Sequence, residues 1–247
     1  MTPANRTLIG IAIAACVIAF GGVGRGEAAA LRVEPVLVEV FAPGAASTLT
    51  LRNDDSTAAT VQIRVFKWSQ ANGKETLEPT TAVVASPPIV KLAPQTDYIA
   101  RIVRVTKSPV AAEESYRIFV DQLPMKGGPP QQVKLLIRQS IPVFFSQRQD
   151  EQPAVTWSIG YDGPRLVVKA KNSGERRSRI SSLTLKDRAG KTIAFGDGLV
   201  GYVLGGSTMS WMAPSRPHGF GGGGSIALTA QSDTGPVDVV VRAPSAP

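Results

Sequence analysis

The sequence predicts an all-β protein made of two immunoglobulin-like β-sandwich domains. Short runs of β-branched and aromatic residues recur along 31–146 and again along 154–247, separated by glycine, proline, asparagine and aspartate. Several runs alternate apolar and polar residues, which is the period of a half-buried strand. No segment of helical length keeps a 3.6-residue apolar period, so we expect little helix. The polar stretch 147–153, which ends at a proline, is the predicted linker between the domains.

Residues 1–30 are predicted to be a cleaved signal peptide for export. The stretch begins with a short segment that carries Arg6, continues as an apolar run over 9–20, and ends in an alanine triplet at 28–30. This is the order of a secretory signal. The apolar run is shorter than the roughly 18 residues that a membrane-spanning helix needs, so we expect no stable membrane insertion.

A lipoprotein signal is the alternative for this leader, because Ile13-Ala14-Ala15-Cys16 resembles a lipobox. The apolar run continues past Cys16 to Phe20, which favours ordinary cleavage near Ala30. Cys16 is the only cysteine in the sequence. A chain that begins after residue 30 would therefore have no disulfide, no thiolate metal site and no cysteine nucleophile.

The distribution of charge argues against a nucleic-acid partner. The formal net charge is +8 for the whole sequence and becomes +7 without residues 1–30, which contain two arginines and one glutamate. The basic residues are scattered, apart from a cluster at Arg176, Arg177 and Arg179. We expect that cluster to be a solvated loop tip, and the positive charge to steer encounter with an acidic partner.

The residue types of most catalytic centres are scarce in this sequence. His218 is the only histidine, and there is no G-x-S-x-G, H-E-x-x-H, P-loop or EF-hand motif. The acidic pairs Asp54-Asp55 and Glu113-Glu114 are adjacent in sequence, so their side chains should point apart. We therefore expect neither an enzyme nor a metal or other cofactor.

The first domain carries strand signals at the density of an immunoglobulin-like sandwich. The expected strands are 31–35, 48–52, 61–68, 89–92, 98–105, 116–123 and 133–145. Asn72-Gly73 predicts a tight hairpin turn, since this dipeptide readily adopts positive φ at both positions. The stretch 124–130 is rich in glycine and proline and predicts a loop.

The second domain repeats this pattern with more glycine and fewer large apolar residues. The expected strands are 155–159, 166–170, 180–185, 192–195, 208–212, 226–228 and 237–241. A turn is expected at 172–174 and a loose connection at 219–224. Trp68, Trp157 and Trp211 are each isolated within strands and are expected to pack in cores.

The order of the first-domain segments resembles the N-terminal domain of periplasmic pilus-assembly chaperones, the PapD-like family of chaperone–usher systems. The matching landmarks are LRVEP at 31–35, LTLRN at 49–53, the run 61–68, SPPIVKLAP at 86–94, RIVR at 101–104, YRIFVDQLP at 116–124 and RQSIPVFF at 138–145. The ending SIPVF resembles the archaic, spore-coat-protein-U-associated branch more than the P-pilus branch. The second half of the chain matches only weakly.

The resemblance implies two domains in a boomerang arrangement whose cleft receives a pilus or fimbrial subunit. Such a subunit is an immunoglobulin-like fold without its last strand, and the chaperone supplies a strand until the next subunit replaces it. The resemblance also implies a periplasmic location and delivery of the subunit to an outer-membrane usher. It leaves open whether free chaperone self-associates through its exposed strand.

Three residues of the last strand of the first domain are the candidates for the donated strand. Val133, Leu135 and Ile137 follow a period of two, so their side chains project from one face. Each would contribute about 1.5–3 kcal/mol on filling an apolar groove. The alternative is that this face belongs to the core of the chain's own sandwich, and the residues alone favour that alternative. The family resemblance favours the donor role.

The residues that would bind the C-terminal carboxylate of the subunit do not carry over directly from the resemblance. The better-known branch holds the C-terminal carboxylate of the subunit with an arginine of the first strand and a lysine near the end of the last. Leu37 and Pro142 stand at those positions here, and neither binds an anion. The replacement candidates are Arg101, Arg104 and Arg138, because a guanidinium binds a carboxylate through two parallel hydrogen bonds. For each of them an exposed polar face of a sandwich is the alternative.

Two further expectations concern the whole protein. The family's interdomain charge cluster does not transfer, because Gln122 and Ser146 occupy two of its positions, so the sequence does not predict how the domains are held together. The competing function is a secreted two-domain module for adhesion or carbohydrate binding. Such a module would present aromatic or acidic residues on a cluster of loops, and no such group stands out in the sequence.

Overall fold

A computed structural model describes residues 31–124, 136–214, 220–221 and 224–242. Within those ranges the regular structure is all strand, arranged as two β-sandwiches, which confirms the predicted fold class. The same ranges contain no helix long and apolar enough to cross a membrane. The candidate donor residues Val133 and Leu135, and also His218, lie outside the described residues.

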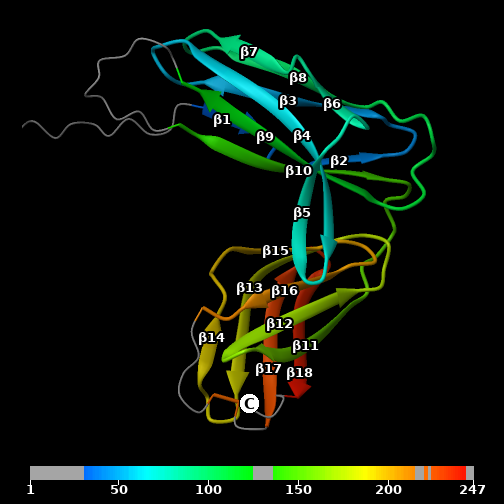
Figure 1. Ribbon diagram of the computed structural model, residues 1–247, viewed down its shortest axis with the longest axis vertical. Helices are drawn as coiled ribbons and strands as arrows, with labels where there is room; N and C mark the ends of the chain where they lie inside the picture. The colour runs from blue at the N-terminus through cyan, green and yellow to red at the C-terminus, as the bar shows by residue number, and fades with distance from the viewer. Residues whose placement is uncertain (1–30, 125–135, 215–219, 222–223, 243–247) are drawn as a thin grey trace, which may run out of the picture. The chain divides into compact units, whose positions relative to one another are not determined.

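The first sandwich packs two sheets face to face (Figure 1). One sheet has the order β1 (Leu31–Glu34), β3 (Ala46–Asn53), β8 (Asp97–Arg104), β6 (Val83–Ser86). The other has the order β2 (Val38–Phe41), β10 (Arg138–Ser146), β9 (Glu114–Leu123), β4 (Ala59–Ala71), β5 (Lys74–Pro79), and β7 (Ile89–Leu92) also pairs with β4. Alternate residues of these strands fill the core between the sheets. Fully enclosed examples are Leu49, Ile102, Ile118, Val120 and Val143.

The second sandwich is built in the same way from the remaining strands. One sheet has the order β11 (Val155–Asp162), β12 (Arg165–Asn172), β16 (Thr208–Met212). The other has the order β14 (Thr192–Ala194), β13 (Ser178–Asp187), β17 (Ser225–Ser232), β18 (Gly235–Arg242), and β15 (Leu199–Val203) also pairs with β13. Val168, Leu183, Leu185 and Leu228 are fully enclosed in its core.

The predicted hairpin turn at Asn72-Gly73 is confirmed. Their φ angles are 54° and 77°, as a tight turn between antiparallel strands requires. The turn joins β4 to β5, and a Cβ atom on Gly73 would lie 2.3 Å from Ser210 Oγ of the second sandwich. Glycine therefore serves two purposes here, the positive φ and the close approach of this hairpin to β16.

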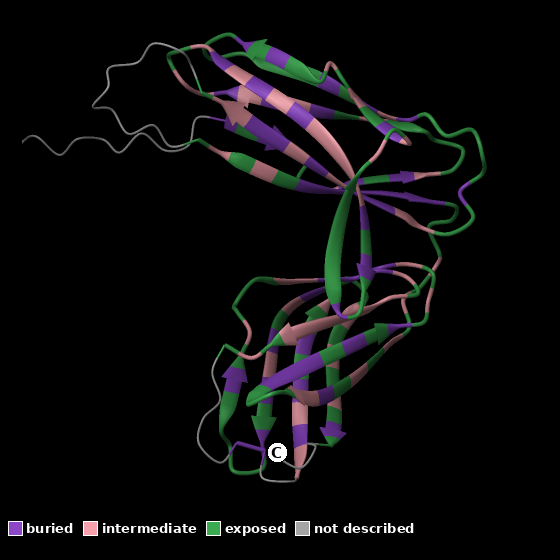
Figure 2. Cartoon of the chain, viewed as in Figure 1, coloured by how far each residue is buried: buried purple, intermediate pink, exposed green. Residues whose placement is uncertain are grey.

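Burial changes along two strands that matter for the site (Figure 2). All residues of β5 are exposed, whereas β4 beside it alternates between buried and half-buried residues along most of its length. In β10, the first three residues are exposed or half-buried and the remaining six are buried. One end of β10 is therefore enclosed by the fold, and the other end lies at the surface.

Candidate functional site

Half of β10 forms an open sheet edge. Residues Val143–Phe145 lie between β9 and the parallel strand β2, whereas Arg138–Pro142 pair with β9 alone. On their other side, no strand of the described chain pairs with them. An uncovered row of N–H and C=O groups is a template for pairing with another chain. This segment is therefore a candidate binding edge.

The hydrogen-bond pattern shows which groups face outward. Gln122 N donates to Ile137 O on the β9 side, and Ala42 N donates to Ser146 O on the β2 side. Because main-chain groups alternate in direction, Arg138 and Ser140 turn their N–H and C=O groups to the open edge. Pro142 occupies the next outward position, where its missing N–H removes no bond to β9. The open edge therefore has no N–H donor at Pro142, and the pairing of β10 with β9 loses no hydrogen bond there.

The side chains of β10 alternate between two faces. Ile141, Val143 and Phe145 are buried in the core of the first sandwich. Ile137, just before the first residue of β10, follows the same alternation, so its side chain belongs to the same face, and it is half-buried. Val133 and Leu135 have the same parity but lie outside the described residues. The structure therefore places Ile137 at the point where the core ends and the open edge begins.

The opposite face of β10 carries Arg138 in an ion pair. Arg138 pairs with Asp121 of β9 and stacks over Phe119, with its guanidinium carbon 5.1 Å from the ring centroid. Arg64 binds the same carboxylate with Nη2–Oδ2 at 2.7 Å. Burial opposes ionisation of Asp121, but hydrogen bonds from Arg138 and Arg64 outweigh it and lower the pKa of this carboxyl. Arg138 lies at the candidate edge, although its charge already has a partner.

The other two anchor candidates lie elsewhere. Arg104 is buried and makes two bonds to Glu114, with Nε–Oε2 at 2.9 Å and Nη2–Oε1 at 2.7 Å. A third bond joins its Nη1 to Thr106 O at 2.7 Å. Arg101 is exposed on β8, which belongs to the other sheet. The structure therefore does not bring Arg101, Arg104 and Arg138 together.

A cavity of about 440 Å³ lies beside the open edge, and we call it the basic pocket. Its walls come from both sandwiches and include Leu37, Arg117, Pro142, Arg179 and Tyr202. The rest of the lining is Val36, Ser140, Ser181, Ser182, Asp197, Gly198 and Leu199. The two positions at which the resemblance places basic residues thus face this pocket as Leu37 and Pro142. The cations that face it are two arginines that the sequence did not single out for this role.

Arg117 is the better enclosed of these two cations. Its guanidinium carbon lies 3.8 Å from the ring centroid of Trp68 and 5.6 Å from that of Tyr202. Its nearest carboxylate is Glu75, with Nη2–Oε1 at 3.9 Å, and no described residue accepts a hydrogen bond from it. Burial lowers the pKa of Arg117, against the opposing influence of Glu75. A guanidinium packed on aromatic rings can still donate its N–H groups to an anion.

Another arginine, Arg177, joins the two sandwiches, and here the sequence expectation is wrong. Arg177 was expected in a solvated loop tip, but its side chain is 2% exposed and forms ion pairs with Glu113 and Glu39. Its main-chain N also donates to Glu113 Oε1 at 2.9 Å, and Ser146 Oγ donates to Glu113 Oε2 at 3.0 Å. The guanidinium stacks 3.7 Å from the centroid of Phe144. Charge clustering alone could not show that two distant glutamates converge on this residue.

An aromatic cluster and one amide complete the junction. Trp68, Phe144, Tyr202 and Leu204 form a buried cluster of their own, so Trp68 does pack in a core, although not inside either sandwich. Gln70 Nε2 donates to Tyr202 O at 2.8 Å, and Leu204 N donates to Gln70 Oε1 at 2.9 Å. The Gln70 amide thus bonds to the main chain at the end of β15 as a neighbouring strand would. It holds the main chain of Tyr202, a wall of the basic pocket.

The pH dependence of the junction follows from Glu39. Burial alone would raise the pKa of Glu39, but hydrogen bonds and attraction from Arg177 and Arg176 outweigh it and place the pKa below 4.5. A lowered pKa in the folded state stabilises the fold above the ordinary value and loses that effect as the pH falls through the folded value. We expect Glu39→Gln to be less stable than the wild type at neutral pH and to lose less stability on acidification. Chemical unfolding at several pH values measures this, and parallel losses in both proteins would contradict it.

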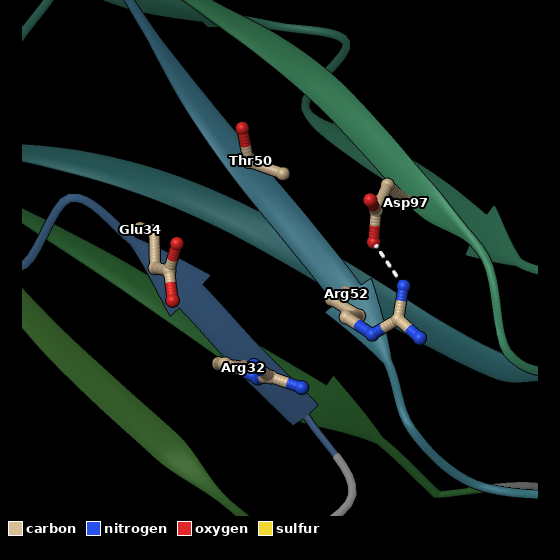
Figure 3. Close-up of a pocket in the computed structure, with 5 residues that line it drawn as sticks. All are labelled: Arg32, Glu34, Thr50, Arg52 and Asp97. Atoms are coloured by element: carbon tan, nitrogen blue, oxygen red, sulfur yellow. Dashed lines mark hydrogen bonds and ion pairs between the residues drawn. The ribbon is translucent and has the colours of Figure 1, made fainter.

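A second cavity, of about 380 Å³, lies on the outer face of the other sheet (Figure 3). It is lined by Arg32, Glu34, Thr50, Arg52 and Asp97. Arg52 Nη1 binds Asp97 Oδ1 at 2.9 Å, and Arg32 pairs with a neighbouring aspartate. Exposed pairs of this kind contribute little to stability, and they engage both arginines of this cavity. Within the described ranges, no group of histidine, cysteine, aspartate and glutamate side chains is placed to hold a metal ion.

Comparison with known proteins places the first sandwich in a family. Residues 30–148 match the family model described as the pili and flagellar-assembly chaperone, PapD N-terminal domain. No curated protein matches the sequence. Among solved structures, the chain resembles the chaperone in the CsuC–CsuE pre-assembly complex from archaic Csu pili of Acinetobacter baumannii, with 24% identity and a TM-score of 0.67. That match covers 86% of this chain and 98% of the other.

Two further structures show the same two-sandwich fold. The Escherichia coli chaperone DraB matches with 23% identity and a TM-score of 0.53, over 86% of this chain and 97% of DraB. The SafB chaperone, solved in complex with the Salmonella enterica pilin SafA, matches with 19% identity and a TM-score of 0.58, over 85% of this chain and 95% of SafB. The first sandwich of this chain therefore matches the PapD-like family of pilus-assembly chaperones, and the whole chain shares their two-sandwich fold.

Proposed function

We propose that this protein is a periplasmic chaperone that binds a pilus or fimbrial subunit by strand donation and delivers it to an outer-membrane usher. The observation that carries the proposal is the open half of β10, with the basic pocket beside it. The CsuC and SafB structures support it, because each contains a chaperone bound to its subunit. The likeness to CsuC and the SIPVF ending both favour the archaic branch.

The first component of binding is the main chain of the open edge. Arg138 and Ser140 offer N–H and C=O groups, and Pro142 offers only its C=O. A subunit strand that pairs here would satisfy groups on both partners, since the subunit lacks its own last strand. Pairing must stop at Val143, where β2 already occupies the edge.

The second component is a row of apolar side chains. In the proposal, Val133, Leu135 and Ile137 enter the groove of the subunit, and Ile137 is the member nearest to the chaperone's own core. Each would contribute about 1.5–3 kcal/mol before the cost of ordering the strand. A core role for the same residues remains the competing explanation, and the substitution below distinguishes the two.

The third component is an anchor for the C-terminal carboxylate of the subunit. We assign the carboxylate anchor to Arg117 and Arg179 of the basic pocket rather than to the arginines chosen from sequence. Arg104 is already bonded to Glu114, and Arg101 lies on the other sheet. The basic pocket shares Ser140 and Pro142 with the open edge, so a chain bound at the edge leads directly to Arg117.

The donor role is tested by co-expression with a subunit encoded beside this protein. We expect Leu135→Asp to abolish the co-purifying complex, because a carboxylate cannot enter an apolar groove. Leu136→Asp is the matched control: it lies next in sequence on the opposite face and is 48% exposed, so the complex should survive. Thermal melting checks that both variants fold. A Leu135→Asp variant that is folded and still binds the subunit would refute the donor assignment, and one that fails to fold would favour the core role.

A further inference from the structure

The second sandwich ends in an edge strand that takes no part in the proposed subunit site. In the described chain, β18 pairs only with β17 (Figure 1). The strand nearest to its other side is β11 of the opposite sheet, and no backbone ladder joins the two. The edge of β18 is therefore open.

The side chains of β18 differ sharply between its two faces. Val237, Val239 and Val241 face inward and pack against the core of the second sandwich. On the outer face, Val240 is 71% exposed and stands between the exposed residues Asp238 and Arg242. An edge with an exposed valine on its outer face differs from β5, whose edge is protected by charges and a proline.

The direction of the main chain fixes which groups are free. A two-residue turn joins β17 to β18, with Ser232 opposite Gly235. Since Gly235 closes that turn, the residues two, four and six positions later also face β17. Asp238, Val240 and Arg242 therefore turn their N–H and C=O groups outward. Pro236 fits this register, since its missing N–H falls on the free side.

The outward residues are complementary to a second copy of themselves. If two β18 strands meet antiparallel about Val240, the two Val240 side chains face each other. Asp238 of each copy then stands opposite Arg242 of the other, which forms two ion pairs by symmetry. Within the part of the chain that the structure describes, neither Asp238 nor Arg242 has an ion pair or side-chain hydrogen bond of its own. The outward main-chain groups of the three residues fall in the same register.

We propose that β18 is a homodimer interface in which two copies pair edge to edge about a two-fold axis through Val240. Such a contact is closed, since each edge is used once and no further copy can add. The main-chain ladder supplies the attraction, and the paired charges select the antiparallel register over others. This association leaves β10 and the basic pocket free, so it differs from self-association through the donor strand.

The test is a charge-reversal mixing experiment followed by sedimentation velocity over a concentration series. Asp238→Arg alone places two arginines opposite each other, and Arg242→Asp alone places two aspartates opposite each other. We expect each variant to dimerise about tenfold or more weakly than the wild type, since attraction at both pairs becomes repulsion. An equimolar mixture of the two variants should recover the dimer, because every facing pair then has opposite charges. Arg165→Asp, a substitution at an exposed position of β12, is the control and should leave dimerisation unchanged.

Three results would overturn the proposal. The first is a wild-type protein that stays monomeric over the whole series. The second is a dimer that both charge reversals leave unchanged. The third is a mixture that remains monomeric although each variant folds, as judged by thermal melting. Should either variant fail to fold, Val240→Lys serves instead, and a dimer that tolerates it would equally contradict the assignment. Leu135→Asp separates the two edges, since it should leave this dimer intact.

Discussion

Replacing Arg177 with methionine is expected to lower the free energy of unfolding by about 3–5 kcal/mol, because it leaves a buried carboxylate without its partner. The side chain of Glu113 is 1% exposed and that of Arg177 is 2% exposed. Methionine fills much of the volume that packs on Phe144, so the lost stability arises mainly from the removed charge. Equilibrium unfolding in urea measures it.

Two companion variants make this result specific. Arg148→Met removes a similar pair, Arg148–Asp150, whose side chains are 66% and 67% exposed, and should cost at most about 1 kcal/mol. The double variant Glu113→Gln with Arg177→Met should recover part of the loss, since no charge then remains buried alone. If Arg177→Met lowers the free energy of unfolding as little as Arg148→Met does, the junction between the sandwiches does not depend on this ion pair.

Replacing Arg117 with methionine is expected to weaken subunit binding by about 30-fold to several thousand-fold. This range corresponds to the roughly 2–5 kcal/mol lost when one member of an enclosed, hydrogen-bonded charge pair is removed. The effect should depend on the carboxylate. Wild-type protein should bind a subunit, or a peptide of its last strand, more tightly with a free C-terminus than with an amidated one. Arg117→Met should no longer distinguish the two ligands.

The control for this experiment is Arg101→Met. Arg101 is exposed on the other sheet, so its loss should leave both affinity and the preference for a free carboxylate unchanged. Calorimetric titration measures both quantities. If Arg117→Met retains the full preference for the free C-terminus, the anion site lies elsewhere and the assignment to the basic pocket is wrong.

Much of the fold could be predicted because strand signals are local. The strand expected at 116–123 is present as β9, and its residues Ile118 and Val120 are buried in the core. The turn at Asn72-Gly73 followed from the φ preferences of two residues. The short strand Val38–Phe41 was missed, since four residues between prolines and glycines carry little periodic signal.

The site was less predictable because its parts are distant in sequence. The alternation of side chains along the strand shows that Arg117 points away from the core. It does not show that Trp68 and Tyr202, which belong to different sandwiches, both contact its guanidinium. Arg104 seemed available from its strand pattern, yet Glu114 engages it. Tertiary contacts decide whether an arginine is free, and local patterns do not report them.

The central claim is that the first half of β10 presents main-chain groups which a subunit strand covers. Amide hydrogen exchange tests it most directly, residue by residue, in the free protein and in its complex with a subunit. The account predicts that Arg138 and Ser140 exchange rapidly in the free protein and at least about tenfold more slowly in the complex, while Ile141 and Val143 stay protected in both. If Arg138 and Ser140 are already protected in the free protein, or the subunit leaves them unprotected, this edge is not where the subunit binds.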